Sequence, residues 1–207
     1  MKLSDFRVVP VVVLNDANRA AGLGEALVAG GLPIAEVTFR TPVAAEAIRI
    51  MSENESLLVG AGTVITAAQV DQAVAAGAKF IVSPGISRSV AERALEHGVT
   101  VLPGTVTPSD VMAALELGLE TCKFFPAKVF GGIGALKALG APFPQVGFVP
   151  TGGVQADNLA DYLALPNVVA VGGSWMVPAK AVDVGDFALV RKRCEQAAAL
   201  AAAVKGA

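Results

Sequence analysis

A short apolar run that returns eight times is the sequence feature that most constrains the fold of this chain. Successive runs end 20 to 26 residues apart, and they occupy residues 8–14, 34–39, 57–63, 80–84, 100–104, 121–125, 147–151 and 168–172. Most runs are apolar throughout, which is typical of parallel strands covered on both faces. Helix signals lie between them, such as Thr107-Pro108 at the beginning of one segment and Gly118 at its end. Eight strand–helix units in one chain predict an α/β protein with a closed (β/α)8 barrel.

The length of the chain is compatible with one such barrel. A typical barrel of this kind has about 250 residues, so 207 residues leave little room for insertions. No linker or low-complexity stretch divides the chain, and we expect a single catalytic domain over residues 1–207 with a C-terminal helix at about 183–204. An open doubly wound sheet is the alternative, but it usually carries a glycine fingerprint in its first turn. The turn at residues 14–18 has no glycine.

The composition indicates extensive burial. Hydrophobic residues make up 54% of the chain and charged residues 16%, whereas soluble domains average about 25% charged residues. The longest apolar run, residues 197–204, has eight residues, and a membrane-spanning helix needs about 20. The net charge of −2 gives no basic surface for nucleic acid or an anionic membrane. The first apolar run contains Pro10 and is too short for a secretory signal, so we expect a cytoplasmic protein.

Three charged residues interrupt or follow the apolar strands. Glu36 lies in the second run, Arg40 follows that run directly, and Lys123 lies in the sixth. Because side chains alternate along a strand, Glu36 and Arg40 share one face. A lone buried charge is costly, so we expect the three charges to converge inside the barrel near its open end. The opposite faces of these strands carry residues that we expect beneath the helices: Val37, Phe39, Cys122 and Phe124.

Lys123 can attack a carbonyl group if it loses its proton. An unperturbed lysine has a pKa of about 10.4, and burial beside Phe125 and a nearby cation such as Arg40 would both lower that pKa. A neutral lysine forms a Schiff base, whose nitrogen accepts electrons from a neighbouring bond that breaks. Glu36 is the candidate proton carrier, and Arg40 offers two parallel hydrogen bonds to a substrate carboxylate. A structural ion network that fills the barrel is the alternative interpretation of the three charges.

Glycine pairs follow the last two strands, in Thr151-Gly152-Gly153 and Gly172-Gly173-Ser174. In barrels, the loops after strands seven and eight often bind phosphate through backbone N–H groups, although plain turns also use glycine. Thr63 adds a hydroxyl at the end of the third strand. His97 is the only histidine and the two cysteines are distant in sequence, so we expect no transition-metal site. His97 precedes Gly98 at a helix end, which indicates a structural role.

Two stretches that contain these residues resemble the signatures of a known family. Residues 31–40 read GLPIAEVTFR, and residues 118–131 contain KFFPA at 123–127. They resemble the two signatures of the 2-keto-3-deoxy-6-phosphogluconate (KDPG) and 4-hydroxy-2-oxoglutarate (KHG) aldolase family. The resemblance covers roughly residues 8–178 and includes the stretches GAGT, SPG, PTGG and GGSW. It implies a class I aldolase with a trimeric (β/α)8 barrel, no metal and no cofactor.

The resemblance also implies roles for single residues. Lys123 would form the Schiff base with pyruvate or the keto-acid substrate, and Glu36 would move protons. Arg40 and Thr63 would hold the pyruvate carboxylate. The remaining site residues would hold the distal phosphate, namely Gly152, Gly153, Gly173 and Ser174, or line the pocket, namely Pro84, Phe125 and Thr151.

The expected reaction is reversible cleavage of KDPG, a phosphorylated keto acid, to pyruvate and glyceraldehyde 3-phosphate. Two positions depart from the family pattern: Cys122 replaces a usually aliphatic residue, and Lys128 replaces an often acidic one. Lys128 bears on the choice of substrate more than on the reaction. The nearest alternatives are the same chemistry on KHG or on the galactonate epimer of KDPG. A phosphosugar isomerase with Glu36 as its base and a non-catalytic barrel that serves assembly are alternatives of other classes.

Overall fold

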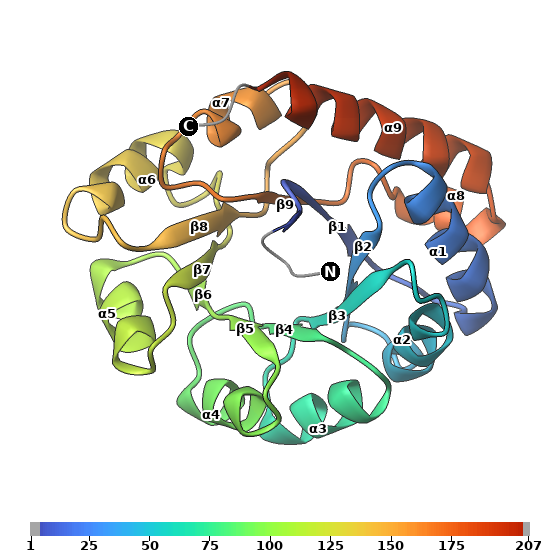
Figure 1. Ribbon diagram of the computed structural model, residues 1–207, viewed down its shortest axis with the longest axis horizontal. Coiled ribbons are helices and arrows are strands. Elements are labelled where there is room, and N and C mark those ends of the chain that lie inside the picture. The colour runs from blue at the N-terminus through green and yellow to red at the C-terminus, as the bar shows by residue number, and fades with distance from the viewer. Residues whose placement is uncertain (1–4, 205–207) are drawn as a thin grey trace.

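The computed structural model describes residues 5–204, in which helices lie outside a curled parallel sheet (Figure 1). The predicted α/β class is therefore confirmed. Each apolar run of the sequence contributes a strand. The strands are β1 (Val8–Val12), β2 (Ile34–Thr38), β3 (Leu58–Gly62), β4 (Phe80–Val82), β5 (Thr100–Leu102), β6 (Gly104–Thr105), β7 (Thr121–Phe124), β8 (Gly147–Pro150) and β9 (Val171–Gly173).

Helices connect the strands and cover the outer face of the sheet. Several begin at the signals that the sequence predicts: Thr107 caps α5 by accepting a hydrogen bond from the Asp110 N–H at 3.2 Å, and Pro108 is the first helical residue. The α-helices are α1 (Ala20–Ala29), α2 (Ala44–Ser52), α3 (Ala67–Ala75), α4 (Arg88–Glu96), α5 (Pro108–Glu116), α6 (Gly132–Gly140), α7 (Leu159–Leu163), α8 (Ala179–Val184) and α9 (Phe187–Ala203), and a 3-10 turn, η2 (Ala17–Arg19), precedes α1.

Backbone hydrogen bonds order the strands as β5-β4-β3-β2-β1-β9 in one group and β6-β7-β8 in the other. The strand pairs in both groups are parallel. Isolated bridges join Phe148 to Val168 and Thr151 to Gly172, which brings the chain around β8 to the chain around β9. Because the pairs are parallel, the carboxyl ends of the strands lie along one edge, where enzymes of this class carry their active sites.

The fifth predicted strand, residues 100–104, is divided at Pro103 into β5 and β6. Proline has no N–H to donate to a neighbouring strand, but the Pro103 carbonyl still accepts a hydrogen bond from the Lys123 N–H at 2.9 Å. The following residue must be small, because a Cβ at Gly104 would overlap the carbonyl of Pro84. The loop after β4 therefore lies close to β6, next to Lys123.

The C-terminal helix begins four residues later than the sequence pattern suggests, at Phe187 instead of about 183. Gly185 has a left-handed backbone, with φ of 75°, and ends α8 after Val184. The carboxylate of Asp186 then accepts a hydrogen bond from the Leu189 N–H at 3.1 Å and caps α9. Gly185 and Asp186 thus act as a helix stop and a helix cap, and they separate α8 from α9 although the chain on both sides is helical.

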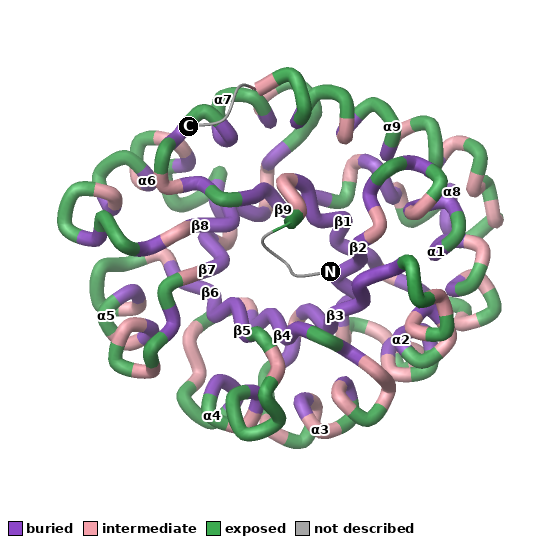
Figure 2. The backbone as a smooth tube through the Cα atoms, in the orientation of Figure 1, coloured by how far each residue is buried: buried purple, intermediate pink, exposed green. Residues whose placement is uncertain are grey.

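Two apolar layers lie on the two faces of the sheet. The larger layer packs between strands and helices, and it contains Val37, Cys122 and Phe124, as expected from their alternation with the charged residues. Figure 2 shows this burial along the strands and on the inner sides of the helices. A smaller layer takes alternate strand positions and therefore faces the inside of the curl. Its members are Val9, Ile34, Leu58, Phe80, Val82, Leu102, Val149 and Ala170.

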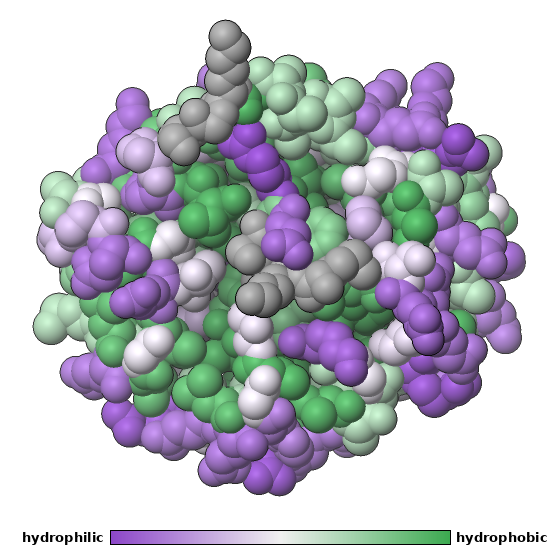
Figure 3. Space-filling view, viewed as in Figure 1, coloured by the Kyte–Doolittle hydropathy of each residue, from purple (hydrophilic) through white to green (hydrophobic). Residues whose placement is uncertain are grey.

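Hydrophilic side chains gather around much of the rim of the face in Figure 3, and some also lie nearer its centre among apolar side chains. The exposed helix faces carry ion pairs, such as Arg49 with Glu46 at 2.8 Å and with Glu53 at 2.6 Å on α2. Within residues 5–204, we find no helix that is both long and apolar enough to cross a membrane. Among residues 5–204, the charged side chains are exposed or partly exposed, with one buried exception.

Candidate active site

The exception is the pair formed by Lys123 and Glu36. Lys123 Nζ donates a hydrogen bond to Glu36 Oε1 at 2.9 Å, and the two side chains are 6% and 5% exposed. Glu36 lies on β2, between β1 and β3, whereas Lys123 lies on β7, between β6 and β8. Since other strands separate β2 from β7, the two side chains meet across the inside of the curl. The sequence predicts this meeting of an acid and an amine from their positions in apolar strands.

Glycines on β3 leave room for this pair. A Cβ at Gly62 would overlap the carboxylate of Glu36, and a Cβ at Gly60 would overlap the ring of Phe80. From the sequence, the GAGT stretch draws attention only to the hydroxyl of Thr63. The role of Gly62 is not visible there, because the carboxylate that fills the space comes from another strand.

Arg40 lies at the exposed edge of the site and contacts Thr63. Its Nε donates a hydrogen bond to Thr63 Oγ1 at 3.2 Å. Thr63 directly follows β3 and has a φ of 56°, and within residues 5–204 it is the one non-glycine residue with a positive φ. A left-handed β-branched residue is strained by about 1–3 kcal/mol, and such strain clusters at functional sites. A cation and a hydroxyl thus lie together at the carboxyl edge of β2 and β3.

The single cluster of three charges expected from the sequence is not formed: Glu36 pairs with Lys123, whereas Arg40 contacts the uncharged side chain of Thr63. β2 ends at Thr38, whose buried hydroxyl donates to the Val12 carbonyl at 2.9 Å. Strand alternation therefore stops before Arg40 and does not fix its side chain beside Glu36. Across the described part of the chain, no hydrogen bond or ion pair joins Arg40 to Glu36 or Lys123.

An aromatic ring is the second group in contact with the lysine, after Glu36. Lys123 Nζ is 5.2 Å from the centroid of the Phe125 ring, a distance at which a ring face attracts a cation. Phe125 follows β7 directly and is partly exposed. The lysine nitrogen therefore has little water around it, and the Glu36 carboxylate is the acceptor within reach of its proton. This geometry can convert the resting ammonium into a nucleophilic amine by a transfer along one hydrogen bond.

The loop after β4 approaches the lysine from the side of β6. Gly104 pairs with Lys123, and the carbonyl of Pro84 lies against Gly104. The Ser83 hydroxyl donates to the Gly85 carbonyl at 2.7 Å and closes this turn. Pro84 therefore lies one strand away from the lysine, although the sequence alone does not distinguish it from an ordinary turn residue.

The loops after β8 and β9 lie side by side. A bridge pairs Thr151 with Gly172, and a Cβ at Gly172 would overlap the Thr151 hydroxyl. Gly173 is buried at the end of β9, whereas Ser174 is exposed beyond it. Residues that are more than 20 positions apart in the sequence thus share one short stretch of the carboxyl edge.

The loop after β8 has a backbone that requires glycine. Gly152 and Gly153 have φ values of 90° and 91°, a region that other residues rarely adopt. Asn158 Nδ2 donates to the Gly153 carbonyl at 3.1 Å, and the Lys128 N–H donates to the Gly152 carbonyl at 2.9 Å. The Lys128 side chain lies against Gly153, where a Cβ would overlap it. Lys128, which departs from the family pattern, is therefore in contact with one of the two glycine loops.

The remaining titratable residues that the sequence singles out lie outside this edge. Burial raises the pKa of the Cys122 thiol to about 11, against the opposing effect of the Thr105 hydroxyl, so Cys122 is a neutral apolar side chain. His97 Nε2 lies 2.7 Å from Asp71 Oδ1, between α4 and α3. Hydrogen bonds from Arg93 and then from His97 lower the pKa of Asp71. His97 thus joins two helices.

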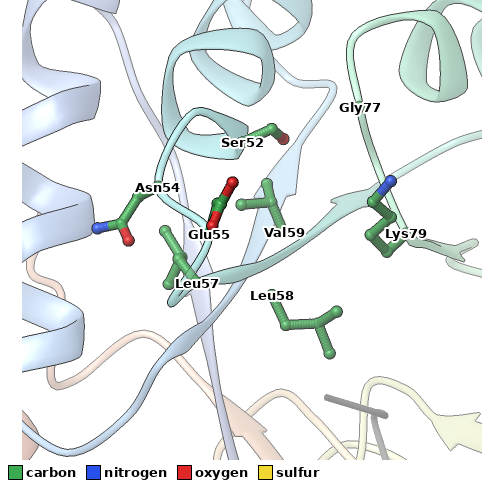
Figure 4. Close-up of a pocket in the computed structure, with 8 residues that line it drawn as sticks. All are labelled: Ser52, Asn54, Glu55, Leu57, Leu58, Val59, Gly77 and Lys79. Atoms are coloured by element: carbon green, nitrogen blue, oxygen red, sulfur yellow. The ribbon is translucent and has the colours of Figure 1, made fainter.

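A cavity of about 480 Å³ lies at the amino end of β3 (Figure 4). The residues that line it are Ser52, Asn54, Glu55, Leu57, Leu58, Val59, Gly77 and Lys79. The predicted site residues follow the carboxyl ends of the strands, whereas this cavity lies where α2 and α3 return to the sheet. It is therefore separate from the buried lysine.

The fold and the site together define a class of protein. A curled parallel sheet carries a buried lysine with its own proton acceptor, and glycine loops flank the same edge. Such a site belongs to an α/β enzyme that handles a carbonyl group through an amine.

Comparisons with known proteins agree with this class. The family model described as KDPG and KHG aldolase matches residues 1–193. A 2-dehydro-3-deoxy-phosphogluconate aldolase of Treponema pallidum is 49% identical over 94% of this chain and 93% of its own. The crystal structure of the KDPG aldolase of Zymomonas mobilis with 3-phosphoglycerate has a TM-score of 0.90 and 44% identity, over 98% of this chain and 93% of that one. A KDPG aldolase of Legionella pneumophila, with pyruvate captured as a covalent carbinolamine, has a TM-score of 0.90 and 43% identity over 93% and 94%.

The chain belongs to the KDPG and KHG aldolase family. The resemblance noted in the two sequence signatures is thereby confirmed over nearly the whole chain.

Proposed function

We propose that this protein is a class I aldolase that cleaves KDPG to pyruvate and glyceraldehyde 3-phosphate. The observation that carries the proposal is the buried Lys123 Nζ at 2.9 Å from Glu36 Oε1. The relatives named for this activity and the pyruvate carbinolamine of the Legionella pneumophila enzyme support the same chemistry. The protein is thus a lyase, and its reaction provides the cleavage step of a sugar-acid pathway of the Entner–Doudoroff type.

Lys123 begins the reaction by passing a proton to Glu36 and attacking the C2 carbonyl of the keto acid. The carbinolamine that forms takes a proton from Glu36 on its hydroxyl and loses water, which leaves a protonated imine. Glu36, which is now a carboxylate again, takes the C4 hydroxyl proton, the C3–C4 bond breaks, and its electrons move into the imine nitrogen. Glyceraldehyde 3-phosphate leaves. The enamine takes this proton from Glu36 at C3, and attack of water on the resulting imine releases pyruvate and restores the lysine.

The other site residues bind the two anionic ends of the substrate. Arg40, with Thr63 as its hydrogen-bond partner at 3.2 Å, holds the carboxylate next to the imine. The loops with Gly152, Gly153, Gly173 and Ser174 hold the distal phosphate through backbone N–H groups. Pro84, Phe125 and Thr151 line the space between. The adjacency of the two glycine loops supports this assignment, since one phosphate can contact both.

We also propose the finer features of the fold and assembly that the family resemblance implies. The chain would be a single (β/α)8 barrel closed between β8 and β9 and between β5 and β6, and it would act as a homotrimer. The bridges Phe148–Val168 and Thr151–Gly172 support closure on one side. The free thiols of Cys122 and Cys194 support a cytoplasmic location, where cysteines stay reduced.

The second candidate is the same chemistry on a different keto acid. The family includes enzymes named for KHG, and the native KDPGal structure is 28% identical with a TM-score of 0.80. Measurement of kcat/KM with and without the phosphate separates these substrates, because a working phosphate site contributes binding energy in the transition state. A strong preference for the phosphorylated substrate supports KDPG or its epimer over KHG.

Borohydride reduction in the presence of pyruvate tests the mechanism directly. We expect one stable adduct, which peptide mapping places on Lys123. Lys123→Ala should abolish both adduct and turnover, and Lys137→Ala, an exposed lysine on α6, should change neither. An adduct on another residue, or none, contradicts the Schiff-base mechanism. The absence of an adduct together with isomerase activity would favour a phosphosugar isomerase, and the absence of pyruvate binding would favour a non-catalytic role.

A further inference from the structure

The loop after β9 is held by contacts that reach beyond its own sequence. Trp175 turns back so that its ring lies where a Cβ of Gly173 would be. The Val177 N–H donates to the Ser174 carbonyl at 3.0 Å and forms a turn. Ser174 itself is exposed and Trp175 is half-buried. These two contacts lie within the loop, and the contact that ties it to the rest of the protein comes from another element.

Arg193 of α9 supplies that contact. Its Nη1 donates a hydrogen bond to the Trp175 carbonyl at 2.8 Å, across 18 residues of sequence. The neighbouring Arg191 pairs with Glu195 on the exposed side of the same helix at 2.8 Å, whereas Arg193 forms no ion pair among residues 5–204. The half-buried guanidinium is thus directed to a backbone carbonyl. Hydrogen bonds from a charged donor are stronger than those between neutral groups.

We propose that Arg193 is a positioning residue that fixes the loop of Gly173 and Ser174 for a phosphate monoester. The proposal rests on the function proposed above, in which this loop holds the distal phosphate. Backbone N–H groups bind an anion well only when they are held in place before it arrives, since ordering a free loop opposes binding. By holding the Trp175 carbonyl, Arg193 fixes the peptide unit that follows Trp175 and restrains the two residues before it.

The loop after β8 has a comparable contact of its own. Asn158 donates to the Gly153 carbonyl at 3.1 Å and accepts from the Gln155 N–H at 2.8 Å. That contact is local, five residues from Gly153, and belongs to the start of α7. The β9 loop depends on a helix beyond α8 instead. A change at Arg193 therefore acts on one of the two phosphate loops and leaves the lysine end of the site untouched.

The test compares two aldehydes in the addition reaction with pyruvate, glyceraldehyde 3-phosphate and unphosphorylated glyceraldehyde. For Arg193→Met, we expect kcat/KM with the phosphorylated aldehyde to fall about 10-fold or more, mainly through a higher KM. We expect less than about a twofold change with glyceraldehyde. Arg193→Lys should recover part of the loss, because it keeps a charged donor. Arg191→Met, on the exposed side of the same helix, should leave both values unchanged.

The outcomes separate this inference from the proposed function. If the wild-type protein forms no borohydride adduct with pyruvate, the proposed aldolase mechanism itself fails. If the adduct forms but Arg193→Met lowers kcat/KM equally for both aldehydes, or for neither, Arg193 is merely structural and the inference is overturned. Should Arg193→Met fail to fold, the Arg193→Lys variant tests the inference through the same ratio of kcat/KM values for the two aldehydes.

Discussion

The carboxylate of Glu36 occupies the space that a side chain at Gly62 would need. A Cβ at position 62 would overlap Glu36 Oε1, the oxygen that accepts the hydrogen bond from Lys123. The bare backbone of β3 therefore sets where the carboxylate lies and, through it, where the lysine proton can go. The arrangement of side chains on β2 and β7 therefore depends on the absence of a side chain at Gly62 of β3.

Gly62→Ala should impair catalysis more than it impairs folding. The new methyl group pushes the carboxylate from its place, and overpacking of this kind costs about 1–3 kcal/mol. Loss of a positioned proton carrier should lower kcat by about 100-fold or more. Steady-state turnover and thermal unfolding measure the two effects.

Gly134→Ala is the matched control for this substitution. A Cβ at Gly134 meets no atom within 4 Å, and the residue lies inside α6. Alanine there should raise the free energy of unfolding by about 0.5–1 kcal/mol and leave kcat unchanged. Wild-type turnover in Gly62→Ala would contradict the proposed dependence of Glu36 on this glycine.

Glu36→Gln should slow every proton transfer and still allow the imine to form. The amide has nearly the shape of the carboxylate and keeps an oxygen that can accept the Lys123 hydrogen bond, but it cannot take the proton. General acid–base catalysis is worth about 10²- to 10⁴-fold, so kcat should fall within that range. Borohydride should still trap pyruvate on Lys123, more slowly than in the wild type. Turnover equal to that of the wild type would remove Glu36 from the mechanism.

Much of the fold could be predicted because the relevant signals are local. Continuous apolar runs identify strands buried on two faces, and Thr107-Pro108 marks a helix start that the structure contains. The division at Pro103 and the break at Gly185 could not be predicted in the same way. At both places a single residue separates two stretches of the same kind of secondary structure.

The same distinction, between features that local signals predict and features that they do not, applies to the candidate site. Charge in an apolar strand identifies Glu36 and Lys123, since such a charge needs a partner inside the protein. Strand alternation does not predict the contact of Arg40 with Thr63, because β2 ends at Thr38 and a loop places the guanidinium; the family resemblance alone brings these two residues together. The contact of Arg193 with Trp175 likewise depends on how α9 packs, which no local motif encodes.

Thr63→Gly should stabilise the protein and weaken its binding of pyruvate. Glycine adopts a φ of 56° without the strain of a β-branched residue, which predicts a gain of about 1 kcal/mol in the free energy of unfolding. Loss of the hydroxyl leaves Arg40 without its partner and should raise the KM for pyruvate about 10-fold. Thr63→Ser keeps the hydroxyl and should bind pyruvate like the wild type. A lower stability of Thr63→Gly together with an unchanged KM would contradict both expectations.

The two buried thiols predict a loss of stability at alkaline pH. Burial raises the pKa of Cys122 to about 11 and that of Cys194 to about 12, whereas a thiol in the unfolded chain has a pKa of about 8.5. Between these values the unfolded state releases protons that the native state keeps, so the free energy of unfolding falls as pH rises. The effect should reach about 1–2 kcal/mol per thiol near pH 10.

Chemical denaturation at pH 8 and pH 10 measures this change, and Cys194→Ala supplies the comparison. The variant loses packing in the core at both pH values, so the informative quantity is the difference between them. We expect the change in the free energy of unfolding between pH 8 and pH 10 to be smaller in the variant than in the wild type. The reduction should equal the contribution of one thiol, because alanine has no proton to release. In native protein at pH 8, both cysteines should also resist alkylation, since the thiolate is the reactive form and both are buried. Equal pH dependence in variant and wild type, or rapid alkylation of the native protein, would show that burial does not hold these thiols neutral.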